Sequence, residues 1–283
     1  MKFGVNTLIW TVGFDRSHLP LIPRIKEHGF DGVQIPMLRP ADYIAADIRK
    51  ATEENGLALS VCPFFIDGLS LISEDESLRK KTQAHLREVI KVAAEAGAES
   101  IAGPLYCPVG YLPGRRRNDD EWKWAVEGYQ SAVPALVEYG LTMGVESLNR
   151  FETYFLNTAD DLAKITDAVG HPSVGVLYDT FHGNIEDKSV PGAIRTIGKR
   201  LQHVHACEND RGIPGTGHQD WNGIFQALRD IHFDGWLTIE SFAFTLGDLA
   251  ASAAIWRDLA PTPEHIAFEG IKFLRQNFAP AAA

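Results

Sequence analysis

The sequence predicts an α/β fold, a (β/α)₈ TIM barrel that forms one domain over residues 1–283. The first reason is that short apolar, β-rich runs recur along the chain and alternate with amphipathic segments of helical period. Strands that alternate with helices pair in parallel through right-handed crossovers. The second reason is their number, because eight such units in roughly 250 residues match a closed barrel. The third reason is that no Pro-, Gly- or Ser-rich linker divides the chain.

The strands are predicted from apolar runs of four or five residues. In chain order they are Phe3–Asn6, Gly32–Ile35, Ala58–Cys62, Ser100–Gly103, Thr142–Glu146, Gly175–Asp179, Leu201–His205 and Trp236–Glu240. The alternative arrangement is an open, doubly wound sheet, which usually carries a Gly-rich phosphate-binding turn after its first strand. Here the first strand is followed by Thr-Leu-Ile-Trp, without a GxGxxG motif. The closed barrel is therefore favoured.

The helices are predicted from the amphipathic segments between the strands. These segments are Pro20–His28, Ala41–Asn55, Ser77–Ala96, Asp120–Tyr139, Thr158–Val169 and Trp221–Ile231. A glycine directly follows each of the first four, as expected for helices that end with a left-handed residue. Thr158 and Asp161 resemble a capping box with a shorter acid. The apolar stretch Ile266–Phe278 is either an outer helix or part of an interface, and Ala279–Ala283 is expected to be a frayed tail.

The composition is that of a folded protein with an acidic surface. Hydrophobic residues make up 45% of the chain, which excludes disorder for most of it. The formal net charge of −10 argues against a nucleic-acid-binding protein, because phosphate contacts need clustered Lys and Arg. The one basic run, Arg115–Arg117, lies among turn residues and is interpreted as a solvated loop. We therefore expect no nucleic-acid partner.

Neither a signal peptide nor a membrane span is predicted, because the chain has no long uninterrupted apolar stretch. The three cysteines, Cys62, Cys107 and Cys207, are too widely spaced for a disulfide framework or a zinc knuckle. They are expected to be free thiols in a reducing compartment. The sequence thus predicts a cytoplasmic protein without a membrane partner.

Potential metal ligands end four consecutive predicted strands. These residues are Glu146, Asp179, His205 and Glu240, and each separation is about one βα unit. Active residues of a barrel project from the carboxyl ends of its strands, so the four side chains should converge on one half of the mouth. Buried like charges without a cation are strongly unfavourable, which argues against four unrelated polar residues. Three carboxylates and one imidazole suit Mn²⁺, Mg²⁺ or Co²⁺ better than a thiolate-binding metal.

A second layer of polar residues follows these strand ends in the chain. Glu152 lies shortly after the fifth strand, His182 after the sixth and Arg211 after the seventh. They are candidates to bind the hydroxyls and carbonyl of a polar substrate held on the metal. His203 shares a strand face with His205 because alternate residues point the same way. One layer deeper, His203 is interpreted as a hydrogen-bonded residue of the barrel interior.

The candidate site residues lie in four segments: VESLNRFETYFLNT (145–158), LYDTFHGNIED (177–187), HVHACENDRGIPGTGHQDW (203–221) and WLTIESF (236–242). Together with the opening FGVNTLIW and the segment IAGPLYCPVGYLPGRR (101–116), these segments resemble the ketose 3-epimerase family, which includes D-tagatose, D-allulose and L-ribulose 3-epimerases. The resemblance covers nearly the whole chain.

The resemblance implies a cofactor and a role for each site residue. It implies one divalent metal, Mn²⁺ above all, with Co²⁺ or Mg²⁺ as alternatives, held by the four strand-end residues. Glu146 and Glu240 would also be the two catalytic bases on opposite faces of C3. Substrate would be bound by Glu152, His182 and Arg211. The family tends to form homodimers or homotetramers.

The implied reaction interconverts free ketoses that differ at C3. The expected pairs are D-fructose and D-allulose, D-tagatose and D-sorbose, and L-ribulose and L-xylulose. The C3 proton is acidic because it lies next to the C2 carbonyl, and the metal would stabilise the cis-enediolate formed by its loss. The preferred ketose is left open.

Three rival functions remain. Another metal-dependent isomerase, such as a hydroxypyruvate, inosose or aldose–ketose enzyme, could use the same barrel. A metal-dependent endonuclease would need more His ligands and a basic face, which the net charge of −10 opposes. A non-catalytic sugar-binding protein would not need two acid–base carboxylates on one metal.

Overall fold

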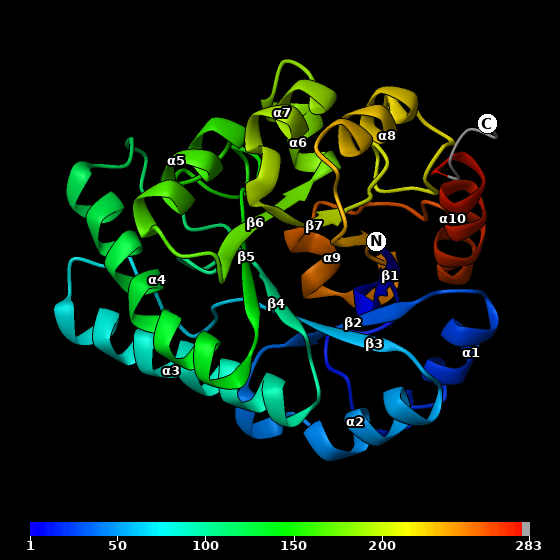
Figure 1. Cartoon of the computed structure of the whole chain (residues 1–283), viewed down its shortest axis with the longest axis horizontal. Coiled ribbons are helices and arrows are strands. Elements are labelled where there is room, and N and C mark those ends of the chain that lie inside the picture. Colours follow the sequence, from blue (N-terminus) through cyan, green and yellow to red (C-terminus); the bar gives the residue numbers. More distant parts are fainter. Residues whose placement is uncertain (279–283) are drawn as a thin grey trace.

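The computed structural model describes residues 1–278, and it contains a closed barrel of eight parallel strands in sequence order (Figure 1). The predicted TIM barrel fold is therefore confirmed. The first and last strands close the ring, with Val5 paired to Ile239. The strands are β1 (Lys2–Asn6), β2 (Gly32–Met37), β3 (Ala58–Pro63), β4 (Ser100–Gly103), β5 (Thr142–Glu146), β6 (Val174–Asp179), β7 (Leu201–His205) and β8 (Trp236–Ile239).

Helices surround the barrel as an outer layer, and their apolar faces pack against the strands (Figure 1). They are α1 (Leu21–Glu27), α2 (Ala45–Glu54), α3 (Glu76–Glu95), α4 (Asp119–Tyr139), α5 (Ala159–Val169), α6 (Thr180–Glu186), α7 (Val190–Ile197), α8 (Trp221–Asp230), α9 (Asp248–Ser252) and α10 (Pro263–Phe278). The stretch for which the sequence left two roles open forms α10, and its residues Ile271 and Leu274 are buried. It is thus an outer barrel helix.

Three local predictions need correction. No helix was predicted between β6 and β7, where α6 and α7 lie; the Pro191-Gly192 pair near the start of α7 obscured its helical pattern. The predicted second helix begins later, at Ala45, because Pro40–Asp42 forms a separate 3₁₀ turn. The last strand ends at Ile239, so Glu240 follows β8 directly instead of ending it.

The signals for helix ends were accurate. The four predicted stops, Gly29, Gly56, Gly97 and Gly140, all have positive φ. Gly140 directly follows α4, and Gly170, which was not predicted as a stop, follows α5 in the same way. A residue with a side chain would be strained there. The Thr158 hydroxyl accepts a hydrogen bond from the Asp161 amide and begins α5, which confirms half of the predicted capping box. The Asp161 carboxylate accepts instead from the amide of Asn157, one residue before Thr158.

An aromatic side chain occupies part of the amino-terminal end of the barrel. Trp236 of β8 lies across this end, where β1 and β2 carry glycines. A Cβ on Gly4 would lie 2.8 Å from Thr238 Oγ1 and 3.1 Å from the Trp236 ring. The small residues therefore make room for the ring. We call this layer, defined by Gly4, His203, Trp236 and Thr238, the barrel floor.

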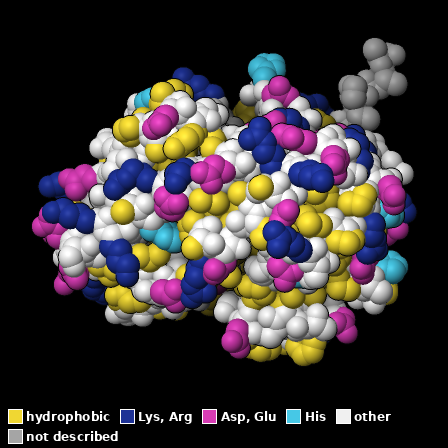
Figure 2. Space-filling model, turned by 90° about the horizontal axis from the view of Figure 1, so that it is seen from below, with side chains coloured by type: hydrophobic (Ala, Val, Ile, Leu, Met, Phe, Trp, Pro, Cys, Tyr) yellow, Lys and Arg dark blue, Asp and Glu magenta, His cyan; other side chains and the backbone are white. Residues whose placement is uncertain are grey.

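The surface carries mixed charge. Figure 2 shows one face of the molecule, on which Lys and Arg are interspersed with Asp and Glu. The basic run lies in the exposed loop between β4 and α4, as predicted, but two of its guanidinium groups are paired. Arg115 binds Glu121 at 2.8 Å and Arg117 binds Asp161 at 2.6 Å. These pairs neutralise much of the run.

The cysteines Cys62, Cys107 and Cys207 are free, as predicted, and all three are buried. Among the helices formed by residues 1–278, none has the length and apolar character needed to cross a membrane. The predicted frayed tail, 279–283, lies outside the described residues.

Candidate metal centre and substrate pocket

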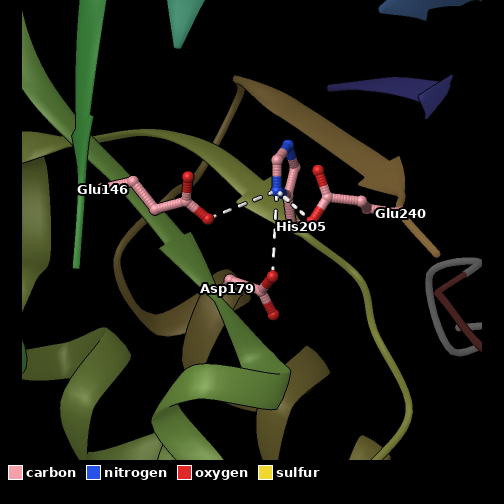
Figure 3. A group of neighbouring side chains, drawn as sticks. All are labelled: Glu146, Asp179, His205 and Glu240. Atoms are coloured by element: carbon pink, nitrogen blue, oxygen red, sulfur yellow. Dashed lines mark ion pairs between the residues drawn. The ribbon is translucent and has the colours of Figure 1, made fainter. Parts of the chain in front are cut away.

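The four predicted metal ligands converge at the carboxyl ends of the barrel strands (Figure 3). Glu146 ends β5, Asp179 ends β6, His205 ends β7 and Glu240 follows β8. Each offers one ligand atom, and these atoms lie within 4.8 Å of one another. All four side chains are buried. The topology brings them together because neighbouring strands deliver their last residues to one side of the mouth.

One nitrogen of His205 faces the three carboxylates. Its Nδ1 lies 3.6 Å from a Glu146 oxygen, 3.8 Å from an Asp179 oxygen and 3.2 Å from a Glu240 oxygen. This nitrogen is buried and has no hydrogen-bond partner among the described residues. The other nitrogen, Nε2, lies 2.8 Å from the side-chain oxygen of Gln34. The imidazole is therefore oriented with its free nitrogen toward the acids.

The electrostatics of the group favour a bound cation. Burial would lower the pKa of His205, yet Glu240 and Glu146 raise it to about 10. Burial raises the pKa of Glu146 to about 7. Burial would also raise the pKa of Glu240, but His205 and Arg211 lower it to about 2. The carboxylates thus favour a positive charge in the space between them and His205 Nδ1.

The donor set fits a divalent metal ion. It offers carboxylate oxygens from three residues and one imidazole nitrogen, a combination suited to Mn²⁺, Mg²⁺ or Co²⁺. The hydrogen bond from His205 Nε2 to Gln34 matches the outer contact that metal-ligating histidines almost always make. The unpartnered Nδ1 is the atom that such an ion would need.

Arg211 lies against the same acids. Its Nη1 donates to Asp179 at 2.7 Å and to Glu240 at 3.0 Å. The guanidinium lies between the rings of Phe181 and Phe242, 4.2 and 5.1 Å from their centres. These contacts hold one permanent positive charge beside the cluster, which partly compensates its carboxylates.

His182 and Glu152 extend the polar network away from the cluster. Arg211 Nη2 lies 3.1 Å from His182 Nε2, and the Asn149 amide lies 3.1 Å from His182 Nδ1. The Asn149 side chain donates to Glu152 at 2.8 Å. Burial lowers the pKa of His182 to about 3, so this imidazole is neutral. All seven predicted site residues therefore belong to one connected site.

A cavity of about 440 Å³ opens onto this site. Five of the predicted residues line it, namely Glu146, Glu152, His182, Arg211 and Glu240. Most of the remaining wall is apolar and includes Leu8, Phe64, Phe242 and Leu249. Helix α9 closes one side, and Figure 1 shows it in front of the barrel centre. The volume and the mixed lining are typical of a small-molecule site.

Arg211 is placed by a loop that a buried glutamate organises. Glu208 accepts hydrogen bonds from the Gly215 amide and from Trp221 Nε1, each at 2.8 Å. Arg211 itself has left-handed backbone, with φ at 65°, and its amide donates to the carbonyl of Glu208. A strained non-glycine residue persists only where its surroundings hold it, and such residues cluster at functional sites.

The sequence analysis missed the buried amides that support the centre. Asn6 ends β1 and Gln34 lies in β2, and both contact the predicted ligands. A signal was available for both: Asn6 is the polar last residue of an apolar run, and Gln34 is a polar residue inside one. His203 lies where it was predicted, buried, with Nε2 2.8 Å from Thr238 Oγ1.

The fold and the site define a TIM barrel with a candidate metal centre at its mouth, and comparison with known proteins identifies its family. Residues 22–277 match the xylose isomerase-like TIM barrel family. A probable ketose 3-epimerase of Synechocystis is 37% identical over 278 residues, which is 98% of this chain and 97% of that protein. A D-psicose 3-epimerase of Agrobacterium fabrum is 32% identical over 265 residues, 92% of this chain and 91% of the relative.

Solved structures give the same result. The crystal structure of D-allulose 3-epimerase from Methylomonas in complex with D-allulose matches with a TM-score of 0.92 and 26% identity. The match covers 98% of this chain and 97% of that one. The chain belongs to the ketose 3-epimerases of the xylose isomerase-like TIM barrel family. It is an isomerase of the epimerase class.

Proposed function

We propose that this chain is a divalent-metal-dependent 3-epimerase of free ketoses. The observation that carries the proposal is the placement of Glu146 and Glu240. These two buried carboxylates approach from opposite sides of His205, and both line the cavity (Figure 3). Inversion at one carbon needs a proton removed on one face and another delivered on the opposite face, so two bases that flank the cavity suit this reaction.

The proton transfers are assigned to the two glutamates. In one direction Glu146 takes the C3 proton and Glu240 supplies a proton to the other face; in the reverse direction their roles exchange. Glu152 and His182 hold O1 and O2 of the sugar, and Arg211 provides positive charge at the same end. A bound divalent cation would supply Lewis acidity, which makes the C3 proton more acidic.

The metal is assigned to Glu146, Asp179, His205 and Glu240, and Mn²⁺ is the proposed ion, with Co²⁺ or Mg²⁺ as substitutes. Three carboxylates favour hard and borderline divalent ions over thiolate-binding ones. The free Nδ1 of His205 supports the assignment, because this nitrogen already faces the three acids.

Free ketoses are proposed as substrates, in the pairs D-fructose and D-allulose, D-tagatose and D-sorbose, and L-ribulose and L-xylulose. Among the described residues that line the cavity, Arg211 is the only Lys or Arg, and it is engaged by Asp179 and Glu240. The lining also includes the acids Asp67 and Asp248. Asp67 is paired with Arg39 at 2.8 Å, so this neighbouring cation is engaged as well. A phosphate ester would therefore find no free cationic partner among the residues of the lining.

The remaining parts of the proposal concern the whole protein. We infer that it acts as one barrel domain over 1–283, in the cytoplasm, as a homodimer or homotetramer. Light scattering coupled to size-exclusion chromatography measures the assembly. A monomer at micromolar concentration would contradict it.

The activity test uses purified protein, Mn²⁺ and D-fructose, with the sugars resolved by chromatography. The expected product is D-allulose, which also returns to D-fructose when it is the starting sugar. An aldose–ketose isomerase would form an aldohexose instead, and a sugar-binding protein would leave D-fructose unchanged. D-fructose 6-phosphate serves as a second substrate, and a strong preference for it would contradict the proposal of free ketoses.

A further inference from the structure

Two buried amide side chains lie behind the metal centre, outside the cavity lining. Asn6 at the end of β1 and Gln34 in β2 are register partners on neighbouring strands, and neither is exposed to solvent. A buried amide without a role is unfavourable, because each of its polar atoms needs a partner. The partners of these two amides are each other and two of the predicted metal ligands, His205 and Glu240.

The side-chain oxygen of Gln34 accepts two hydrogen bonds. One comes from His205 Nε2 at 2.8 Å and the other from Asn6 Nδ2 at 2.9 Å. Because an amide oxygen only accepts, His205 must carry a proton on Nε2. In the neutral imidazole, the lone pair then lies on Nδ1, which faces the three carboxylates.

Asn6 fixes this arrangement and extends it to a second ligand. Its Oδ1 accepts from the Leu8 amide at 3.0 Å, so its Nδ2 must face the centre. Besides Gln34, Nδ2 donates to Glu240 Oε1 at 3.0 Å. The other Glu240 oxygen lies 3.2 Å from His205 Nδ1. The two amides thus orient both a histidine and a carboxylate ligand.

We infer that Gln34, held in place by Asn6, is a positioning residue that sets the tautomer and ring orientation of His205 for metal binding. This inference rests on the proposed metal-dependent function. Histidine ligands often use a carboxylate as this outer partner. Here a neutral amide serves, so the centre keeps its three carboxylates without a fourth negative charge next to His205.

The test measures Mn²⁺ affinity of the full-length, metal-free protein by electron paramagnetic resonance of the free ion. Gln34→Met keeps the side-chain length but removes the acceptor. Loss of an outer-shell partner typically costs 10- to 100-fold in metal affinity, and we expect a loss in that range. Gln34→Glu keeps an acceptor for His205 and should bind Mn²⁺ as tightly as the unmodified protein or more tightly.

Gln202→Met is the matched control. It makes the same substitution on β7, at the opposite end of the barrel, where Gln202 donates to the Pro172 carbonyl at 3.0 Å. Its Mn²⁺ affinity should equal that of the unmodified protein. Circular dichroism verifies folding of each variant. If Gln34→Met does not fold, Gln34→Asn, which withdraws the acceptor by one methylene, should show the same direction of change.

The inference is overturned if folded Gln34→Met or Gln34→Asn binds Mn²⁺ as tightly as the unmodified protein. It is also overturned if Gln34→Glu loses as much affinity as Gln34→Met, because retention of the acceptor would then have no effect. In both cases the unmodified protein still binds Mn²⁺ and epimerises, so the proposed function stands. Failure of the unmodified protein to bind Mn²⁺ would overturn the proposed function itself, together with this inference.

Discussion

Two histidines on β7, His205 at the mouth of the barrel and His203 at the floor, have opposite electrostatic properties. Both are buried, and their ring centres are 5.2 Å apart. Three carboxylates face His205, and two of them, Glu240 and Glu146, raise its pKa to about 10 although burial opposes this. His203 stacks on Trp236, and burial lowers its pKa well below the usual value. Burial alone therefore does not decide the charge of a histidine; the groups that face it do.

The same contrast holds for the two ends of the barrel. A second cavity, of about 320 Å³, lies at the floor and is lined by His203 and Trp236 among others. The acids on its wall, Glu99 and Asp234, are exposed and pair with Lys2 and the terminal amine. Both ends therefore have cavities, but among the residues that the structure describes, buried acids gather around one point at the mouth and not at the floor. This difference agrees with the general division in TIM barrels, in which the carboxyl-terminal face carries the active site and the amino-terminal face contributes to stability.

Metal removal should have the largest effect on activity, because the predicted metal ligands all lie at the mouth of the barrel. Exhaustive chelation is expected to abolish epimerisation, because the cluster of Glu146, Asp179, His205 and Glu240 would lose the cation that compensates it. Mn²⁺ or Co²⁺ should restore activity and raise the melting temperature, since a ligand that binds only the native state stabilises it. Full turnover by protein shown to be metal-free would refute the site.

Removal of either proposed base should have the next largest effect. Glu146→Gln and Glu240→Gln keep an oxygen for the metal but lose the base. Net epimerisation should fall by about 10²- to 10⁴-fold, the usual contribution of a positioned base. Chromatographic assays of initial rate, normalised to bound metal, measure the loss.

The two variants should also differ in which epimer exchanges its C3 proton with solvent. The carboxylate that remains can still exchange the proton of its own epimer in D₂O, without inversion. Proton NMR of each epimer, incubated with metal-loaded variant, detects this exchange. Exchange of the same epimer by both variants would contradict the assignment of one base to each face.

Substitution of the two histidines should separate the mouth from the floor. His205→Asn should lose Mn²⁺ binding, whereas His203→Asn should keep it and lose about 1–3 kcal/mol of stability, the range for a buried polar group left unsatisfied. Mn²⁺ titration and urea denaturation measure the two quantities on the same samples. If His203→Asn lost as much Mn²⁺ affinity as His205→Asn, the floor and the mouth of the barrel would not be independent.

The smallest effect is expected from overpacking of the floor. Gly4→Ala would place a Cβ 2.8 Å from Thr238 Oγ1 and 3.1 Å from the Trp236 ring. The free energy of unfolding should fall by about 1–3 kcal/mol, the usual cost of overpacking, while kcat and Mn²⁺ affinity stay unchanged. Urea denaturation gives the first quantity. A selective loss of Mn²⁺ affinity would instead couple the floor to the mouth.

The sequence predicted the barrel and its metal ligands because both depend on short-range patterns. Apolar runs and glycine stops repeat along the chain, and a strand end is visible as the last residue of a run. The fold then brings Glu146, Asp179, His205 and Glu240 together by topology alone. The resemblance to a known family added roles for Glu152, His182 and Arg211.

Features that depend on tertiary contacts were not predictable in the same way. Helix α7 begins with a Pro-Gly pair that resembles a turn, and its stability comes from apolar burial of Ile194 and Ile197. The contacts of Asn6 and Gln34 join strands at the start of the chain to β7 and β8 near its end. No local sequence pattern predicts hydrogen bonds between residues so far apart in the chain. A polar residue in an apolar strand indicates only that a partner is needed.

The central claim is that this site exchanges the proton at C3 of a free ketose. Its most direct test incubates the Mn²⁺-loaded protein with D-fructose in D₂O and follows each carbon by NMR. Deuterium is expected at C3 of both D-fructose and newly formed D-allulose, with C1 and C4 unlabelled, and no label is expected after chelation. Deuterium at C1, as in aldose–ketose isomerisation, or at C4, or label that persists in metal-free protein, would contradict the claim.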